Sequence, residues 1–309
     1  MWFLEFYPFI FLEMLSDNIK NYAHLHLIVF IWGFTAVLGA LISLDALPLV
    51  WFRMLFGTVF LGGYVLFKKT DLRITTKSLV KFLFAGLIIA LHWFTFFQAI
   101  KVSNVSITLA CLSTGAFFAS FLEPILYGKK IVFYEVLFGI IAFFGLYIIF
   151  NINVNYLEGI LLGLTSAMLS ALFTVVNSRF VKDHIPTVIS IYELGGGVLF
   201  FTIFLGFTHS FSISFFKLSM NDLFYLLILS SICTAYAFVA STKVMKVLSP
   251  FTVMLTTNLE PIYGIILAVI VFQEKEKMTI EFYFGAALIL LTVILNGIIK
   301  LRKSKNIIS

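Results

Sequence analysis

The sequence predicts an all-α integral membrane protein with ten transmembrane helices, arranged as two inverted five-helix repeats. Apolar residues make up 61% of the chain and charged residues 12%, whereas a soluble domain carries about 25% charged residues. The apolar residues form runs long enough to cross about 30 Å of hydrocarbon as helices. The last five runs resemble the first five in spacing. Because five crossings is an odd number, the second copy must be inverted in the bilayer.

The connections between these apolar runs are short, so neighbouring helices are expected to pack antiparallel. Alternating apolar and polar segments, which are typical of outer-membrane barrels, do not occur in the sequence. We expect the first repeat over residues 24–152, the second over 153–300 and a basic cytoplasmic tail over 301–309. The ten expected spans lie near residues 25–43, 48–67, 79–99, 105–127, 132–150, 157–178, 186–207, 222–242, 249–272 and 280–299.

Residues 1–23 form a lead before the first span. Its first part, Met1 to Leu15, is rich in aromatic residues, too short to span a bilayer and without basic residues, so it differs from an ordinary signal peptide. It fits an interfacial helix that lies on the membrane. Alternatively, Met14 is the true start of the protein, and sequencing of the mature N-terminus decides between the two.

The net charge of +6 does not indicate nucleic-acid binding, because the basic residues are distributed as in a membrane protein. If the N-terminus is cytoplasmic, the loops on the outer side carry only Lys101, Lys217, Lys275 and Lys277. Most of the other lysines and arginines then fall on the inner side. Basic loops resist translocation, so we expect an inner (plasma) membrane protein with both termini in the cytoplasm.

Short sequence matches support the repeat. The segment IKVS at 100–103 parallels MKVLS at 245–249, and residues 112–115 fall opposite residues 259–261. Pro48 and Pro186 open the second and seventh spans, where a proline is well tolerated because the first-turn N–H has no helical partner.

The chain resembles the EamA family of the drug/metabolite transporter superfamily, and the resemblance covers about residues 20 to 300. It implies a ten-helix fold with a central cavity lined by helices one to four and six to nine, and transport of amino acids, metabolites or drugs, often outward. The sequence departs from the family in its fourth helix, where Gly115 stands in place of a proline and Gly128 in place of an acidic residue. The motifs that carry the resemblance are Trp32-Gly33, Pro48 followed by Arg53, Lys246 to Phe251, Asn258 to Pro261, Glu274 and Gly285.

Glu260 is the strongest candidate for chemistry, because ionisable groups inside the membrane are costly and are functional candidates by default. It is expected in the middle of the ninth helix, beside a kink at Pro261 that leaves the carbonyl of Thr257 without its helical partner. Burial favours the neutral form of a carboxyl group. Glu260 is therefore a candidate for proton coupling, and the alternative is a packing hydrogen bond made by a permanently neutral acid.

Two further ionisable residues lie within expected spans. Glu193, which precedes three glycines in the seventh span, either couples protons or pairs with a cation. Arg53 in the second span either binds a carboxylate or phosphate, snorkels toward the surface or holds a carboxylate at a gate.

Aromatic and imidazole side chains add candidates for the cavity. His92 is expected to be a hydrogen-bonded packing residue more than a proton relay, and Trp93 fits either the interfacial aromatic belt or the cavity. Trp32 lies deeper, on a stripe with Thr35. Thr174, Asn177, Thr257 and Asn258 complete the candidates for the cavity, and Glu123, Pro124 and Pro261 are the candidates for gates.

The sequence predicts no enzyme, no cofactor and no metal site. Cys111 and Cys233 stand alone in apolar spans, without the spacing of a metal site, and motifs for nucleotide binding do not occur. We therefore expect a secondary-active exporter of a small polar metabolite, working by alternating access within the lipid bilayer, with possible proton coupling. The alternatives are a uniporter or channel for small solutes and an intramembrane lipid-modifying enzyme, for which Cys111 and His92 are the only conceivable pair.

Overall fold

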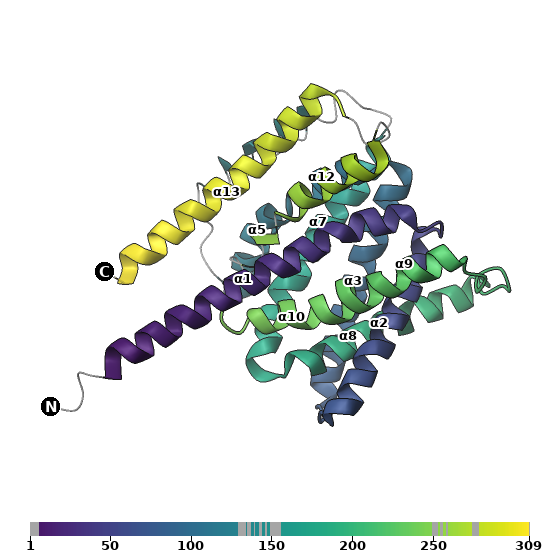
Figure 1. Ribbon diagram of the computed structural model, residues 1–309, viewed down its shortest axis with the longest axis horizontal. Helices are drawn as coiled ribbons and strands as arrows, with labels where there is room; N and C mark the ends of the chain where they lie inside the picture. Colours follow the sequence, from purple (N-terminus) through teal and green to yellow (C-terminus); the bar gives the residue numbers. More distant parts are fainter. Residues whose placement is uncertain are drawn as a thin grey trace.

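The computed structural model describes residues 6–128, 156–248, 259–273 and 278–308, together with isolated positions between 134 and 148 and at 253, 256 and 257. This part of the chain is helical and contains no strand (Figure 1). Its helices are α1 (Phe6–Leu41), α2 (Ala46–Lys68), α3 (Thr76–Val102), α4 (Val105–Leu112), α5 (Gly115–Tyr127), α7 (Leu157–Asp183), α8 (Pro186–Phe207), α9 (Met220–Ser230), the π-helical η2 (Ser231–Tyr236), α10 (Ala237–Val244), α12 (Glu260–Phe272) and α13 (Ile280–Ile308).

Several helices begin or end at residue types that suit a helix terminus, where backbone N–H and C=O groups lack helical partners. Thr75, Asn104 and Ser219 precede α3, α4 and α9, and each side chain accepts a hydrogen bond from an N–H of the first turn. Pro186 opens α8. Gly128 ends α5 at a φ of 65°, a left-handed conformation that glycine adopts without strain.

Contacts at the two ends of the bundle indicate that successive helices run in opposite directions. At one end, Ser43 in the α1–α2 loop bonds to Asp222 at the start of α9, and Lys101 at the end of α3 donates to a carbonyl of the same loop. At the other end, Ser78 at the start of α3 lies 3.1 Å from a ring nitrogen of His184, which follows α7. These contacts fit the antiparallel packing that the short connections predict.

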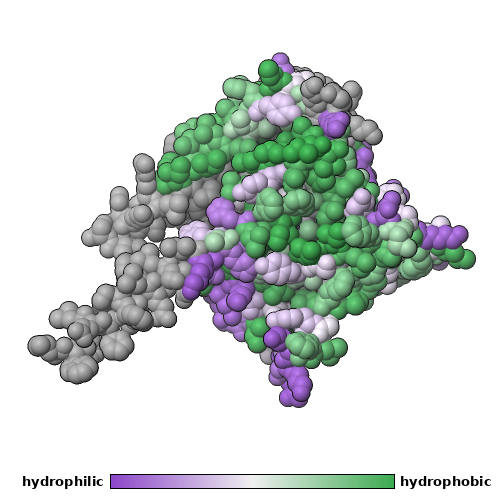
Figure 2. Space-filling model, viewed as in Figure 1, coloured by the Kyte–Doolittle hydropathy of each residue, from purple (hydrophilic) through white to green (hydrophobic). Residues whose placement is uncertain are grey.

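Seven helical segments of the described chain are long and apolar enough to cross a membrane, and α12 and the apolar part of α13 are shorter. Figure 2 shows apolar residues over much of the visible face of the bundle, with hydrophilic residues mainly toward its edges. The expected span at 132–150 lies largely outside the described residues. An all-helical membrane protein is therefore confirmed, whereas ten spans are not.

The N-terminal lead is continuous with the first span. Helix α1 begins at Phe6 and runs to Leu41 without a break, and its first turns project beyond the rest of the bundle (Figure 1). The structure thus joins residues 6–23 to the first span in one helix.

The fourth expected span, residues 105–127, is divided into α4 and α5. The division falls at Ser113 and Thr114, whose hydroxyls donate to the carbonyls of Ala110 and Cys111 at 2.6 and 2.7 Å. Such side-chain bonds compete with the regular backbone bonds of a helix. The expected span is nevertheless long and apolar enough to cross a membrane as one segment, Val105–Tyr127, with a local break at these two residues.

The ninth expected span, residues 249–272, is also not one regular helix around Glu260. Helix α12 begins at Glu260 with Pro261 in its first turn, and the N–H of Leu259 bonds to the carbonyl of Thr256 in a tighter turn. Val253, Thr256 and Thr257 before this turn are also helical, so the regular helix is interrupted beside Glu260 and Pro261, where the sequence predicts a kink, and Glu260 opens the segment that follows.

Helix α3 packs most extensively against α7 and α8, and glycines permit this close approach. A Cβ atom on Gly86 of α3 would lie 2.4 Å from the carbonyl oxygen of Glu193 in α8. On α7, a Cβ on Gly159 would lie 2.5 Å from the side chain of Ser103, and one on Gly163 would lie 2.8 Å from that of Cys111. Small residues at such positions let membrane helices meet through their backbones.

We expect Gly86→Ala to destabilise the bundle by about 1–3 kcal/mol, because the added methyl group meets a backbone atom that cannot move aside without shifting α3 from α8. The measurement is the thermal unfolding of the purified protein in detergent. Gly63→Ala is the matched control, since a Cβ there meets no atom within 4 Å. Equal unfolding temperatures for the two variants would contradict this account of the α3–α8 contact.

Candidate functional site

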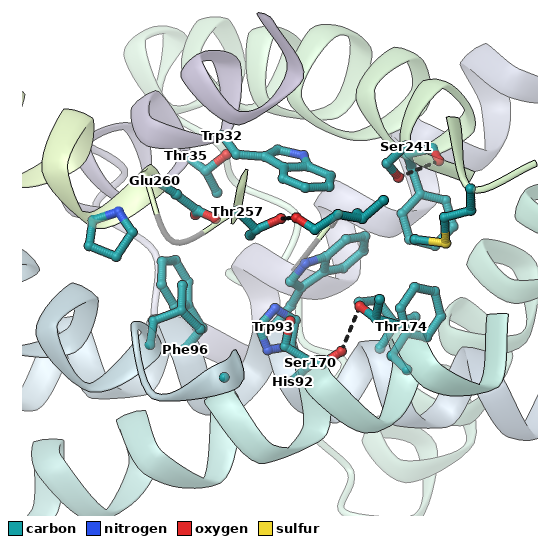
Figure 3. Close-up of a pocket in the computed structure, with 18 of the residues that line it drawn as sticks. Trp32, Thr35, His92, Trp93, Phe96, Ser170, Thr174, Ser241, Thr257 and Glu260 are labelled. Carbon is teal, nitrogen blue, oxygen red and sulfur yellow. Dashed lines mark hydrogen bonds between the residues drawn. The ribbon is translucent and has the colours of Figure 1, made fainter. Parts of the chain in front are cut away.

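A cavity lies inside the bundle between α1, α2, α3, α7, α10 and α12. Its volume is about 80 Å³, counted as the space open to the centres of water molecules, which is room for several waters or a small solute. Figure 3 shows the labelled side chains converging on this space, with Trp32 and Thr35 on one side and Trp93 and His92 on the opposite side. The lining combines aromatic walls with a few polar groups, as in most small-molecule sites.

The charge at the centre of the site is Arg53, whose side chain is 1% exposed and lines the cavity. Its guanidinium carbon lies 3.9 Å from the centre of the Trp93 ring, and its Nε–H donates to the hydroxyl of Thr234 at 2.7 Å. Nη1 is buried and has no hydrogen-bond partner. Arg53 therefore does not snorkel to the surface, and Trp93 lies inside the bundle, away from the interfacial belt.

Glu260 is the second ionisable residue of the site. It is 7% exposed, it lines the cavity at the start of α12, and it interacts electrostatically with Arg53. Neither oxygen comes within the 4.0 Å of an ion pair with that arginine, and Asp71 with Arg73 is the ion pair seen in the described part of the chain. The two side chains thus line a common cavity without forming an ion pair with each other.

His92 lines the cavity while one of its ring nitrogens is fixed in the wall. Nδ1 lies 2.9 Å from both the carbonyl oxygen and the hydroxyl of Ser166 in α7. A carbonyl oxygen can only accept, so Nδ1 carries the proton in the neutral ring and Nε2 is left as an acceptor. Cys111 is fully buried outside the lining, so the structure does not pair it with His92 in this cavity.

Glu193 and Asn177 form a separate buried pair between α7 and α8. The side-chain amide of Asn177 donates to Glu193 Oε1 at 2.8 Å, and both residues are 0% exposed. Neither lines the cavity, although both were sequence candidates for the site. Oε2 of Glu193 and Oδ1 of Asn177 are buried without a partner.

The remaining sequence candidates fall into three groups. Thr174, Thr257 and Pro261 line the cavity together with Trp32 and Thr35. The gate candidates Glu123 and Pro124 lie in α5, away from the lining. Asn258 lies outside the described residues.

Thr234 was missed by sequence reasoning, although it holds Arg53 in place. It lies in η2, the π-helical turn between α9 and α10, and its hydroxyl donates to the carbonyl of Leu229, five residues earlier, at 2.8 Å. Short π-helical segments are frequent at functional sites. No sequence signal singles out this threonine, because a π-helical turn is set by packing and by the partner of its side chain.

Both breaks in the helices open on the cavity. Leu112 and Gly115 flank the break between α4 and α5, and Glu260 and Pro261 begin α12; all four line the cavity. Irregular backbone at membrane depth is tolerated where it is buried in protein or lines a cavity. The described residues contain no group of three histidine, cysteine or acidic side chains placed to hold a metal ion.

Residues 22–151 and residues 157–298 each match the sequence pattern of the EamA-like transporter family. The chain belongs to the EamA-like transporter family. The two matches cover most of the sequence and meet close to the boundary between the expected halves, so the family resemblance and the presence of two family repeats are confirmed. This protein is accordingly a multi-pass membrane protein of a family of transporters.

Comparison with solved structures agrees at the level of the fold. One structure, described only as a crystal structure of a protein, has a TM-score of 0.66 and covers 89% of this chain and 96% of its own. The sequence identity is 14%, so the likeness concerns the fold alone. No match was found among curated proteins.

We expect Thr234→Val to lower stability by about 1–3 kcal/mol, because it leaves the buried Nε–H of Arg53 without an acceptor. Thr165→Val is the matched control: Thr165 is exposed and its hydroxyl bonds only within its own helix, to the carbonyl of Leu161. Thermal unfolding in detergent measures both. A loss that is the same in both variants would mean that the Arg53–Thr234 bond adds nothing to stability.

Proposed function

We propose that this protein is a secondary transporter of the inner (plasma) membrane that exports a small polar metabolite, such as an amino acid, by alternating access. The observation that carries the proposal is the central cavity, which is lined by Arg53 and Glu260 between apolar helices. A substrate site between two repeats that rock around it is the usual arrangement of such transporters.

The cavity extends toward one end of the α9–η2–α10 segment. Ser241 in α10 and Met245 just beyond it line the cavity, as does Val253. Asp222 lies in the first turn of α9, at the opposite end of the same segment. Under the topology that the basic residues predict, the cavity thus extends toward the cytoplasm.

The opposite end is closed by a polar cluster, here called the Asp222 cluster and made of Ser43, Lys101, Ser219 and Asp222. The carboxylate of Asp222 accepts from the N–H and the hydroxyl of Ser43 at 2.6 and 2.7 Å, and from the hydroxyl of Ser219 at 2.7 Å. Lys101 adds an opposite charge and donates to the carbonyl of Ile42. The cluster ties the α1–α2 loop to α3 and α9.

Aromatic packing beside the Asp222 cluster reinforces the closure. Trp51 at the start of α2 lies 5.7 Å from Phe211 and 5.5 Å from Phe215, measured between ring centres, and its indole N–H donates to Thr202. This holds the α8–α9 loop against α2. A passive channel would need a path through this end, so the closed end favours a transporter that alternates between two states.

Proton coupling through Glu260 is part of the proposal. A carboxyl group in a water-accessible cavity can exchange protons with the solvent that reaches it, whereas Glu193 lies outside the cavity lining in a buried pair with Asn177. We therefore favour Glu260 over Glu193, although the sequence nominated both.

The test of the proposed function compares the metabolites released by cells that produce the protein with those released by cells that lack it, followed by transport of the enriched compound in reconstituted vesicles. We expect one class of small polar metabolite to accumulate outside the producing cells. If vesicles with and without the protein move the compound equally, the protein is not its transporter.

In the same vesicles, we expect Glu260→Gln to remove the response of transport to an imposed pH gradient, because an amide cannot carry a proton across. Glu193→Gln is the matched control and is expected to keep that response. If both variants respond like the unaltered protein, neither acid couples protons to transport.

We expect Asp222→Asn to loosen the closed end, because an amide nitrogen cannot accept the hydroxyl bonds that the carboxylate accepts and no longer attracts Lys101. The measurement is the labelling rate of Thr35→Cys by a membrane-impermeant maleimide, in protein whose two native cysteines are replaced by serine. Labelling from the Asp222 side should rise several-fold. Asp71→Asn, at an exposed aspartate, is the control, and equal rates in both variants would show that the cluster does not close this end.

A further inference from the structure

We propose that the free edge of the Arg53 guanidinium binds a carboxylate group of the transported solute, so that the substrate is an organic monocarboxylate or carries one such group. This inference rests on the proposed transport function and names the chemistry that the cavity recognises. It concerns the terminal nitrogens, because Nε is already engaged by Thr234, and a carboxylate reaches Nη1 only when the side chains that cover it move.

The need for an anion follows from the burial of Arg53. The side chain is 1% exposed, and Nη1 is shielded from solvent without any hydrogen-bond partner. A buried charge without a partner is strongly destabilising, whereas an arginine paired with a planar carboxylate makes two parallel charge-assisted bonds. The indole of Trp93 stabilises the cation from one face, but a ring face does not satisfy the in-plane N–H groups.

Glu260 does not fill this role in the structure. Its carboxylate is near enough to interact with Arg53 electrostatically, yet the two side chains are not within ion-pair distance. Both line the same cavity, so a ligand carboxylate next to Arg53 competes with Glu260 for the positive charge. Binding should therefore tighten in Glu260→Gln at a pH at which Glu260 is ionised in the unaltered protein.

The rest of the lining favours a single negative charge on a partly apolar body. Arg53 is the only arginine or lysine among the described residues that line the cavity, so the two negative charges of a dianion such as phosphate are poorly compensated. Gly115 and Glu260 are the first residues of α5 and α12, and the positive ends of these helices add a modest attraction for an anion. The walls include the aromatic rings of Trp32 and Phe238, which suit an apolar or aromatic body.

Thr234 is the positioning residue. Its hydroxyl donates to the carbonyl of Leu229, which directs its lone pairs toward Nε of Arg53. Gly57 lets α2 approach this turn: a Cβ on Gly57 would lie 3.1 Å from the methyl group of Thr234. With Nε held by Thr234 and the plane held by Trp93, the terminal nitrogens are oriented before a ligand arrives.

The test is equilibrium binding of radiolabelled benzoate to the purified full-length protein in lipid nanodiscs, with unlabelled benzamide, of the same shape but uncharged, and inorganic phosphate as competitors. We expect saturable binding of benzoate, and at least about tenfold weaker competition by benzamide, as the loss of charge-assisted hydrogen bonds implies. Phosphate should compete no better than benzamide. Lack of saturable benzoate binding, equal competition by benzamide or preference for phosphate would each overturn the carboxylate assignment.

Single substitutions test whether benzoate binds at Arg53. Arg53→Gln should weaken benzoate binding at least about tenfold. Arg179→Gln should leave it unchanged, although Arg179 also stacks at 3.9 Å, on Tyr127, because it lies outside the lining. Should Arg53→Gln fail to fold, Glu260→Gln provides the second measurement: it should tighten benzoate binding, and weaker binding there would overturn the competition between the two carboxylates.

These experiments distinguish an error in the carboxylate site from an error in the proposed transport function. If the vesicles transport a metabolite but Arg53→Gln binds benzoate as well as the unaltered protein does, the carboxylate site is wrong and the transport function stands. If benzoate binding depends on Arg53 but no metabolite crosses the vesicles, the site stands and the transport function is wrong.

Discussion

A guanidinium group held inside an apolar bundle determines much of what surrounds it. Arg53 enters from α2, lies over the ring of Trp93 in α3 and donates to Thr234 in η2, so three helices are brought together around one charge. Hydrocarbon cannot solvate such a group. The protein stabilises the charge with an aromatic face and a hydroxyl acceptor, but it leaves Nη1 without a partner.

Irregular backbone gathers around the same charge. The break between α4 and α5, the π-helical turn η2 and the start of α12 all lie at or beside the cavity. Each leaves backbone groups that a regular helix would pair, and in a membrane these groups need protein or water around them. A cavity inside the bundle provides that surrounding, which explains why these irregular segments meet there.

Some polar groups of the bundle are fully hydrogen-bonded and hold helices together, whereas others lack a hydrogen-bond partner. The Asp222 cluster satisfies its carboxylate with three donors at one end, and the Ser166–His92 contact fixes a ring nitrogen in the wall. Arg53, which lines the cavity, retains a buried terminal nitrogen without a partner. This contrast separates the end of the bundle at Asp222, where the polar groups are paired, from the centre, where Arg53 lacks a partner.

The sequence by itself determined that the chain is a helical membrane protein with two family repeats, because hydropathy over about 20 residues decides membrane insertion. It also nominated Trp32, Arg53 and Glu260, since polar and aromatic residues in spans are conspicuous. The tertiary structure decided which nominated groups share a space: Arg53 and Glu260 do, whereas Glu193 and Asn177 pair elsewhere. Rotation of a helix about its axis, like the π-helical turn that presents Thr234, depends on packing against neighbours, which spacing along one chain does not specify.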